Sequence, residues 1–365
     1  MTAAGRSAQA PDRLLCWLWL ACALGPGSRL AGQMLDWCGG DPCRAWLRRT
    51  DGAFRQMAGR RGEKKTPEDF RPVLDCCRAK KIQIIPFGHD DYPLSLSRLP
   101  DLPLVLYCTG SPAWLNAPCL VGMVGSRSPD EYGLWGAQML GQGLAQHGAV
   151  IVSGLAGGLD TACHQAAVEA GAATIGVQGV AIDRTYPAAN RPLRAQMEAH
   201  GCVVGEYPPG ENGAGRNGFL LRNRLIAGLS RALVVVQARE KSGTLSTVGH
   251  AVRYGRAVYA LPGDVTREAS AGTNRLLQEG RAKAVLAAGD LLDRLELAGA
   301  APARQARPLS AAERQVLACL TDAPRRLEAL AAGCGMSQPE LAAVLMQLSL
   351  AGYLRELPGQ QYSLL

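Results

Sequence analysis

Between residues 82 and 296, short runs of β-branched and other apolar residues alternate with longer stretches of helical periodicity. This alternation is typical of a Rossmann-like, doubly wound and mostly parallel α/β sheet. Right-handed crossovers place the loops that follow such strands along one edge, where we expect the ligand. The predicted strands are Ile82–Ile85, Leu104–Tyr107, Leu120–Val124, Val150–Val152, Ala173–Val177, Cys202–Val204, Leu233–Val236 and Val258–Leu261.

Shorter segments flank this central domain, which we place at residues 82–297. Residues 12–75 predict a small helical domain of the helix-hairpin-helix or SAM-like kind. Its Gly25-Pro26-Gly27 turn could meet a DNA phosphate, but a purely structural hairpin is the better explanation. Residues 1–11 are predicted to be disordered, and residues 298–308 (AGAAPARQARP) to be a linker.

Residues 309–365 predict a winged-helix domain, because three helices are followed by a hairpin. The third helix, Ser337–Leu350, carries almost no positive charge, whereas a helix that reads DNA normally brings Arg, Lys, Asn or Gln to the bases. We therefore expect this domain to contact protein, with duplex-specific DNA regulation as the alternative.

The apolar run Leu14–Leu24 resembles the middle of a signal peptide, but it is too short to span a bilayer and a second helical pattern follows it directly. We interpret it as the first helix of the N-terminal domain. The 12 cysteines include the adjacent Cys76 and Cys77 and form no Cys-x-x-Cys pair, so we expect reduced core thiols. The expected location is cytoplasmic, without membrane contact.

Turns of small residues and hydrogen-bond donors follow four of the predicted strands. They contain Gly125-Ser126-Arg127, Ser153-Gly154, Ser242-Gly243-Thr244 and Pro262-Gly263-Asp264. Such turns place backbone N–H groups at helix N-termini, which favour anions. The formal net charge of +8, carried mainly by Arg, also favours an anionic partner. Several anion sites on one edge suit a chain of phosphates.

A further cationic segment is Arg222-Asn223-Arg224, inside a predicted helix. Residues two positions apart do not share a helix face, so we expect one arginine to meet phosphates and the other to pair with Glu206 or Asp160.

Enzyme motifs are incomplete in this sequence. The glycines do not meet the dinucleotide pattern Gly-x-Gly-x-x-Gly, and Gly-Lys-Ser/Thr does not occur. A Rossmann-like phosphoribohydrolase acting on nucleotides is the alternative, but Thr247 stands where such enzymes have their catalytic Glu. Asp160 and His164, four residues apart, could form an acid/base pair or a metal half-site; capping and core hydrogen bonding explain them better. We predict no catalytic residue, metal or cofactor.

Several motifs together resemble the DNA-processing protein A (DprA, also called Smf) family across most of the chain. They are Tyr92-Pro93-Leu94, Val124-Gly125-Ser126-Arg127, the segment from Ser153 to Asp160 with His164, Tyr186-Pro187, the segment from Arg222 to Leu229, Ser242-Gly243-Thr244 and Pro262-Gly263.

This resemblance implies a homodimeric, non-enzymatic protein that binds and protects incoming single-stranded DNA in natural transformation (competence) and helps to load the recombinase RecA. It also implies phosphate contacts by Arg127, Arg191 and the Arg222–Arg224 segment, and base stacking on Phe219, which is the chemistry of sequence-tolerant single-strand binding. The sequence departs from the family at Gly205, Leu220 and Gln237, and none of these departures removes a positive charge from the edge of the sheet. The predicted nucleic-acid-binding residues are Gly125, Ser126, Arg127, Ser153, Gly154, Arg191, Phe219, Arg222, Asn223, Arg224, Ser242, Gly243 and Thr244.

Overall fold

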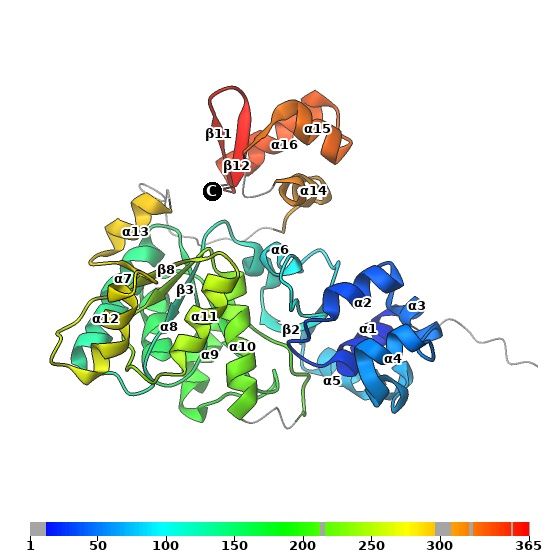
Figure 1. Cartoon of the computed structure of the whole chain (residues 1–365), viewed down its shortest axis with the longest axis horizontal. Coiled ribbons are helices and arrows are strands. Elements are labelled where there is room, and N and C mark those ends of the chain that lie inside the picture. The colour runs from blue at the N-terminus through cyan, green and yellow to red at the C-terminus, as the bar shows by residue number, and fades with distance from the viewer. Residues whose placement is uncertain (1–11, 212–215, 296–307, 321–323, 352, 365) are drawn as a thin grey trace, which may run out of the picture.

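The computed structural model describes residues 12–211, 216–295, 308–320, 324–351 and 353–364. The predicted disordered segment 1–11 and all of the predicted linker except Pro308 lie outside the described residues. Figure 1 shows a helical N-terminal part, a central α/β part and a small C-terminal part, as the sequence predicts.

The central sheet has nine strands in the order β1-β2-β6-β5-β4-β3-β7-β8-β9. The seven neighbouring strands β6, β5, β4, β3, β7, β8 and β9 run parallel to one another. At one edge, β2 pairs antiparallel with β6, and β1 pairs antiparallel with β2. All eight predicted strands are present, and the two-residue β9 is additional. The bounds are β1 Gln83–Pro86, β2 Val105–Gly110, β3 Leu120–Val124, β4 Val150–Ser153, β5 Thr174–Gln178, β6 Cys202–Gly205, β7 Ala232–Val235, β8 Ala257–Ala260 and β9 Lys283–Ala284.

The strand order reverses at β3, which has β4 on one side and β7 on the other. From β3 the chain continues outward through β4, β5 and β6, and then returns to build β7, β8 and β9 on the opposite side. In a doubly wound sheet, the loops diverge at such a switch point and leave a crevice outside the carboxyl ends of the strands. The topology therefore places the candidate site next to the carboxyl ends of β3 and β7.

Helices cover both faces of the sheet because alternate strand residues point to opposite sides. Val121 and Met123 face the core under α7, α8 and α13, whereas Leu120 and Val124 face the core under α10 and α11. The helices of the central part are α6 Leu94–Ser97, η3 Pro112–Asn116, α7 Glu131–Gln146, α8 Leu159–Glu169, η4 Ala188–Asn190, α9 Arg191–His200, α10 Arg216–Leu229, α11 Thr244–Arg253, η5 Glu268–Ser270, α12 Ala271–Gln278 and α13 Ala288–Arg294.

The apolar run Leu14–Leu24 forms α1 (Arg13–Leu24), the central helix of the N-terminal domain, with Trp19 buried and stacked on Phe54 at 5.4 Å. Within the described residues, no helix is long and apolar enough to cross a membrane. All 12 cysteines are free thiols. The other helices of this part are α2 Ala31–Cys38, α3 Pro42–Leu47, α4 Gly52–Ala58, η1 Gly59–Glu63, η2 Pro67–Phe70 and α5 Arg71–Ala79.

The Gly25-Pro26-Gly27 turn faces the central part. A Cβ on Gly27 would lie 3.1 Å from Leu221 and 3.3 Å from Arg224, both on α10. Its amide also hydrogen-bonds the Glu206 carboxylate. The turn is thus used in domain packing, in line with the structural interpretation of this hairpin.

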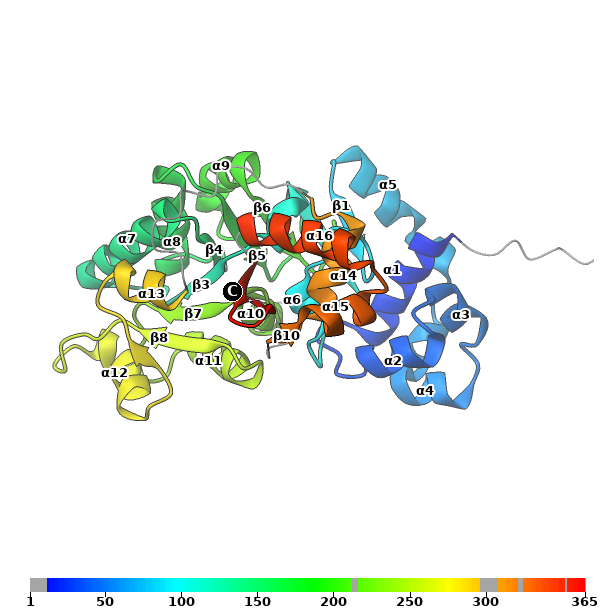
Figure 2. The same ribbon diagram turned by 90° about the horizontal axis from the view of Figure 1, so that it is seen from above.

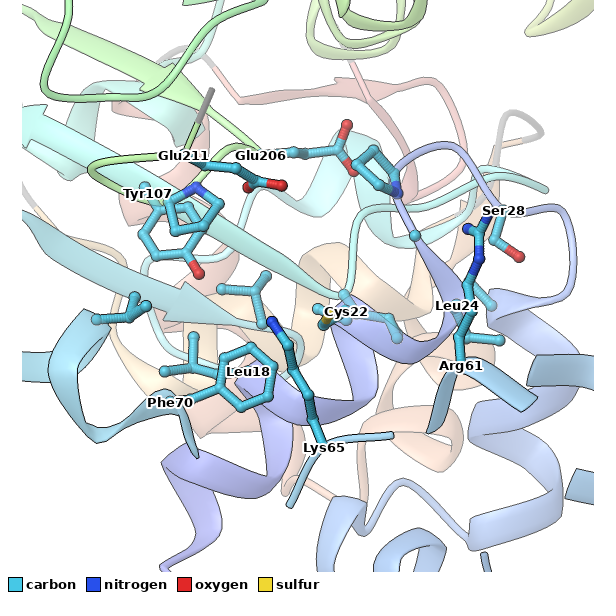
Figure 3. A pocket seen from close by; sticks show the side chains of 18 of the residues that line it. Leu18, Cys22, Leu24, Ser28, Arg61, Lys65, Phe70, Tyr107, Glu206 and Glu211 are labelled. Carbon is cyan, nitrogen blue, oxygen red and sulfur yellow. The ribbon is translucent and has the colours of Figure 1, made fainter. Parts of the chain in front are cut away.

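A cavity of about 530 Å³ lies beside this junction (Figure 3). Its charges are mixed, with Glu206 and Glu211 on one side and Lys65 and Arg61 on the other. The balance of both signs gives it no preference for a polyanion.

The C-terminal part is a winged-helix domain with a three-stranded sheet of order β10-β12-β11. It rests on the edge formed by the amino ends of the strands, on the side of α6 (Figures 1 and 2). There the Arg98 guanidinium donates to the carbonyls of Ala318 (2.8 Å) and Leu320 (2.9 Å), and Arg314 pairs with Asp90 at 2.6 Å. Its elements are α14 Ala311–Cys319, β10 Arg325–Arg326, α15 Leu327–Cys334, α16 Gln338–Leu350, β11 Leu354–Leu357 and β12 Gln361–Leu364.

Candidate nucleic-acid interface

A groove of about 520 Å³ opens at the carboxyl ends of β3 and β7, at the switch point. The loops after both strands and the first half of α10 form its walls. It brings together nine of the predicted residues, which are Gly125, Ser126, Arg127, Phe219, Arg222, Asn223, Ser242, Gly243 and Thr244.

Arg127 is an exposed cation in the lining of this groove. Its Cζ lies 5.1 Å from the centroid of the Phe219 ring, a cation–π contact, and Phe219 in turn packs on Tyr186 at 5.2 Å. Among the described residues, Arg127 makes no ion pair with a carboxylate. A cation without a carboxylate partner, set on an aromatic ring, offers an anion both charge and a stacking surface.

Hydrogen bonds hold the loops after β3 and β7 in place. The Ser126 amide donates to Gln237 O at 2.9 Å, and the Thr244 hydroxyl donates to Gly125 O at 3.0 Å. A Cβ on Gly125 would collide with Leu159, so only glycine allows this approach. Gly243, by contrast, faces open space at the N-terminal end of α11. The loop after β3 is therefore held by hydrogen bonds and by close packing on Leu159. The helix dipole of α11 adds positive potential to the groove.

Arg222 lines the groove, but its donors point inward. Its guanidinium donates to the carbonyls of Gly154 and Val177, at the ends of β4 and β5, and lies 3.7 Å from the Asp160 carboxylate. Only 4% of the residue is exposed. Burial, opposed by Asp160, lowers the pKa of Arg222. Arg222 therefore ties the loop after β4 to α10 and contributes charge to the groove at close range.

Arg224 was predicted to bind nucleic acid, but it lies away from the groove. It is 1% exposed, pairs with Glu206 at 2.5 Å and donates to Asp101 O at 2.7 Å. The two arginines thus leave α10 on different sides, and each has one of the two carboxylate partners that the sequence offered. Because no part of Arg224 reaches solvent at the groove, we leave it out of the candidate site.

Three further predicted residues do not line the groove. The Ser153 hydroxyl is buried and donates to Met123 O at 2.6 Å. Gly154 allows the close approach of Arg222, since a Cβ there would collide with that guanidinium. Arg191 is exposed at the first residue of α9, outside the groove lining. Ser153 and Gly154 therefore act on the site indirectly, by holding the end of β4 against β3 and by leaving room for Arg222.

Sequence reasoning missed two cations, Arg239 and Lys241, which line the groove on the loop after β7. Arg239 is 3.3 Å from Glu268, an exposed pair, and Lys241 is exposed. The signal was available, because Lys241 directly precedes the Ser242-Gly243-Thr244 turn and Arg239 lies two residues before Lys241.

The groove offers little acid/base chemistry. Among its described lining residues, Asp160 is the one carboxylate, and it faces Arg222. His164 is buried with Nδ1 2.7 Å from the Thr174 hydroxyl, and burial lowers its pKa to about 3, so the ring is neutral. No cluster of three metal-ligating side chains occurs in the described part of the chain. Asp160 and His164 are therefore core residues, as expected.

Comparison with known proteins agrees with this arrangement. The family model for DNA recombination-mediator protein A matches residues 83–296, and the model for the DprA winged-helix domain matches residues 299–360. The chain belongs to the DprA/Smf family. The first match covers the whole central sheet, including every loop of the groove.

Relatives of this DprA family member are similar to it in sequence over most of their length. The DNA processing protein DprA of Bacillus subtilis is 38% identical over 232 residues, which are 62% of this chain and 77% of the relative. DprA of Streptococcus pneumoniae is 38% identical over 67% of this chain and 86% of its own. Protein Smf of Escherichia coli is 32% identical, covering 76% of each chain.

Two solved DprA structures are similar to this family member. That of Streptococcus pneumoniae has a TM-score of 0.66 and 30% identity, covering 78% of this chain and 98% of the other. That of Helicobacter pylori, which concerns a single-stranded DNA binding mode, has a TM-score of 0.54 and 30% identity, covering 59% of this chain and 96% of the other.

Proposed function

We propose that this DprA family member binds single-stranded DNA in the groove at the carboxyl ends of β3 and β7, without performing chemistry on it. Arg127 carries the proposal, because it stands exposed over the Phe219 ring with no carboxylate partner among the described residues. Arg239 and Lys241 extend the cationic lining, and Arg222 neutralises Asp160. Arginine on the backbone together with an aromatic ring for a base suits a flexible strand of any sequence.

The wider role that we propose is that of the family: protection of incoming DNA in natural transformation and loading of the RecA recombinase, by a cytoplasmic homodimer. The observations in support are the match to the DNA recombination-mediator protein A family model and the cationic lining of the groove, which would hold a strand by its phosphates. A RecA-filament assay on single-stranded DNA with and without this protein tests the loading role. Absence of any acceleration would contradict it.

The decisive binding experiment is a titration of a labelled oligonucleotide at several salt concentrations. Single-strand affinity should fall linearly with log salt, with a slope of about 0.7 per phosphate neutralised. Duplex of the same sequence should bind more weakly, because its stacked bases cannot reach Phe219. Equal or tighter duplex binding, or an affinity independent of salt, would refute the proposal.

The stacking role of Phe219 gives a separate prediction. Phe219→Leu keeps an apolar side chain on α10 but removes the ring, so single-strand affinity should fall about 5- to 100-fold, the usual value of one stacked base. Phe219→Tyr is the matched control and should bind like the unchanged chain. The slope against log salt should stay constant in both variants, since no charge is removed. An unchanged affinity of Phe219→Leu would exclude stacking.

A further inference from the structure

A second aromatic ring lies beside the groove, outside its lining. Tyr186 belongs to the loop that follows β5, and β5 ends at the same edge of the sheet as β3 and β7 because these strands are parallel. The centroid of its ring is 5.2 Å from that of Phe219, and the two ring planes are tilted by 41°. The two rings therefore form one aromatic surface that begins in the groove and continues onto the loop after β5.

This aromatic surface is open to solvent. Tyr186 is 54% exposed although its ring contacts Phe219, and Phe219 itself is half-buried. Leu220, the next residue on α10, lines the groove and is 47% exposed. Single exposed apolar residues are common on protein surfaces, but a group of them beside a groove is typical of a surface that a ligand covers.

The backbone on both sides of Tyr186 is held by polar contacts that do not involve its ring. Two residues before it, the Arg184 carbonyl accepts a hydrogen bond from Arg194 at 2.6 Å. Four residues after it, the Asn190 side-chain amide donates to Leu155 O at 3.0 Å. These contacts hold the loop without help from the ring, so the ring is available to a ligand.

Two glycines fix the loop after β5 against α10. Gly179 is the first residue after β5, and Gly218 directly precedes Phe219 on α10. A Cβ on Gly179 would lie 2.8 Å from the Gly218 carbonyl oxygen, and a Cβ on Gly218 would collide with the Gly179 carbonyl oxygen. The distance between the two rings is therefore set by the backbone contact of their elements as well as by the contact of the rings.

The neighbouring charges favour a polyanion that carries flat bases. Arg127 contacts the Phe219 ring, and Phe219 contacts Tyr186, so a cation is followed by two aromatic rings. In the loop after β5, Asp183 is the one carboxylate, and it is paired with Lys80 at 2.6 Å. A single strand offers phosphates for such a cation and bases for such rings, whatever its sequence.

We propose that Tyr186 is a second stacking platform for single-stranded DNA, so that two neighbouring bases of the bound strand lie on Phe219 and Tyr186. The strand leaves the groove at Phe219 and continues over the loop after β5. This inference rests on the proposed function, because it extends the path of the same strand.

The test compares the affinities of full-chain variants for a long labelled oligothymidylate. Tyr186→Leu keeps an apolar side chain but removes the ring, so affinity should fall about 5- to 100-fold, the usual value of one stacked base. The slope against log salt should stay constant, because no charge is removed. Tyr186→Phe keeps the ring and should retain the affinity that Tyr186→Leu loses. Trp135→Leu is the matched control, because Trp135 is also 54% exposed but lies on α7, outside the groove lining.

A double variant separates direct stacking from support of the Phe219 ring. If Tyr186 binds a base of its own, adding Tyr186→Leu to Phe219→Leu should weaken binding again, by a similar factor. If Tyr186 only holds Phe219 in place, the double variant should bind like Phe219→Leu alone, and the inference is then wrong. Photo-cross-linking of a strand that contains 5-iodouracil gives a second readout, with adducts expected on both rings. Adducts on Phe219 without any on Tyr186 would contradict the second platform.

Arg127→Ala in the same assay reports on the groove itself. If Arg127→Ala weakens binding and Tyr186→Leu does not, the proposed function stands and the second platform is refuted. If neither substitution changes the affinity, the strand binds elsewhere and both proposals are wrong. Thermal unfolding of Tyr186→Leu checks that the fold is intact, as we expect for an exposed ring.

Discussion

Arg224→Met should lower the free energy of unfolding by about 3–5 kcal/mol, because it leaves the buried Glu206 carboxylate without its guanidinium. The Glu206 side chain is 8% exposed and its pair with Arg224 is 2.5 Å long, so water cannot replace the lost partner. Urea unfolding followed by circular dichroism measures the loss. This loss measures the cost of leaving one charge of a buried pair without its partner. It is larger than the net contribution of the intact pair to the free energy of unfolding.

Two controls separate this explanation from a general packing defect. Adding Glu206→Gln to Arg224→Met removes the unpaired charge and should recover most of the loss. Burial raises the pKa of Glu206, and losing Arg224 raises it further. A group with a raised folded pKa stabilises the fold when protonated and loses that contribution as pH rises, so the defect of Arg224→Met should shrink from about pH 8 to about pH 5. A variant that keeps its stability but loses DNA affinity would instead make Arg224 a direct phosphate contact.

Arg127→Ala should weaken single-strand binding at least tenfold, since it removes an exposed charge-assisted phosphate contact. The loss should be nearly equal for all sequences, and the slope against log salt should fall by about 0.7, the value of one phosphate. Fluorescence anisotropy of poly-pyrimidine and mixed-sequence strands at several salt concentrations measures both quantities. Stability should be unchanged, because the guanidinium is exposed.

Arg127→Lys is the conservative partner of this variant, and Arg78→Ala on α5 is the control for a general change in net charge. The lysine keeps the charge but loses the fork geometry, so the salt slope should return while affinity recovers only in part. Losses that depend on the DNA sequence would mean that Arg127 reads bases, and a loss equal to that of Arg78→Ala would remove it from the site.

The central fold was predictable because its information is local. Runs such as Leu120–Val124 and Val150–Val152 are apolar on both faces, as strands covered by helices must be. The groove followed from the same logic, since parallel strands bring the turns at Gly125 and Gly243 to one edge. The strand β9 was missed because Lys283 and Ala284 are two exposed residues without an apolar pattern.

The orientation of individual side chains was not predictable. Helical spacing showed that Arg222 and Arg224 point to different sides, but only the packed structure shows that both face carboxylates. The environment of Arg224 is built by Gly27 and Asp101, which come from distant parts of the chain. No local pattern contains that information, whereas the exposed Arg127 follows directly from its place in a turn. The position of Arg191 outside the groove likewise depends on how α9 packs.

Two arginines of helix α10, two residues apart, bind the helix to two different parts of the molecule. Arg222 anchors it to the loops of the groove, and Arg224 anchors it to the junction with the N-terminal domain. A truncated protein lacking the first 80 residues would lose the Gly27 amide that Glu206 accepts from. Weak DNA binding by such a fragment would therefore report a loosened helix, and it would say nothing about whether the missing domain touches DNA.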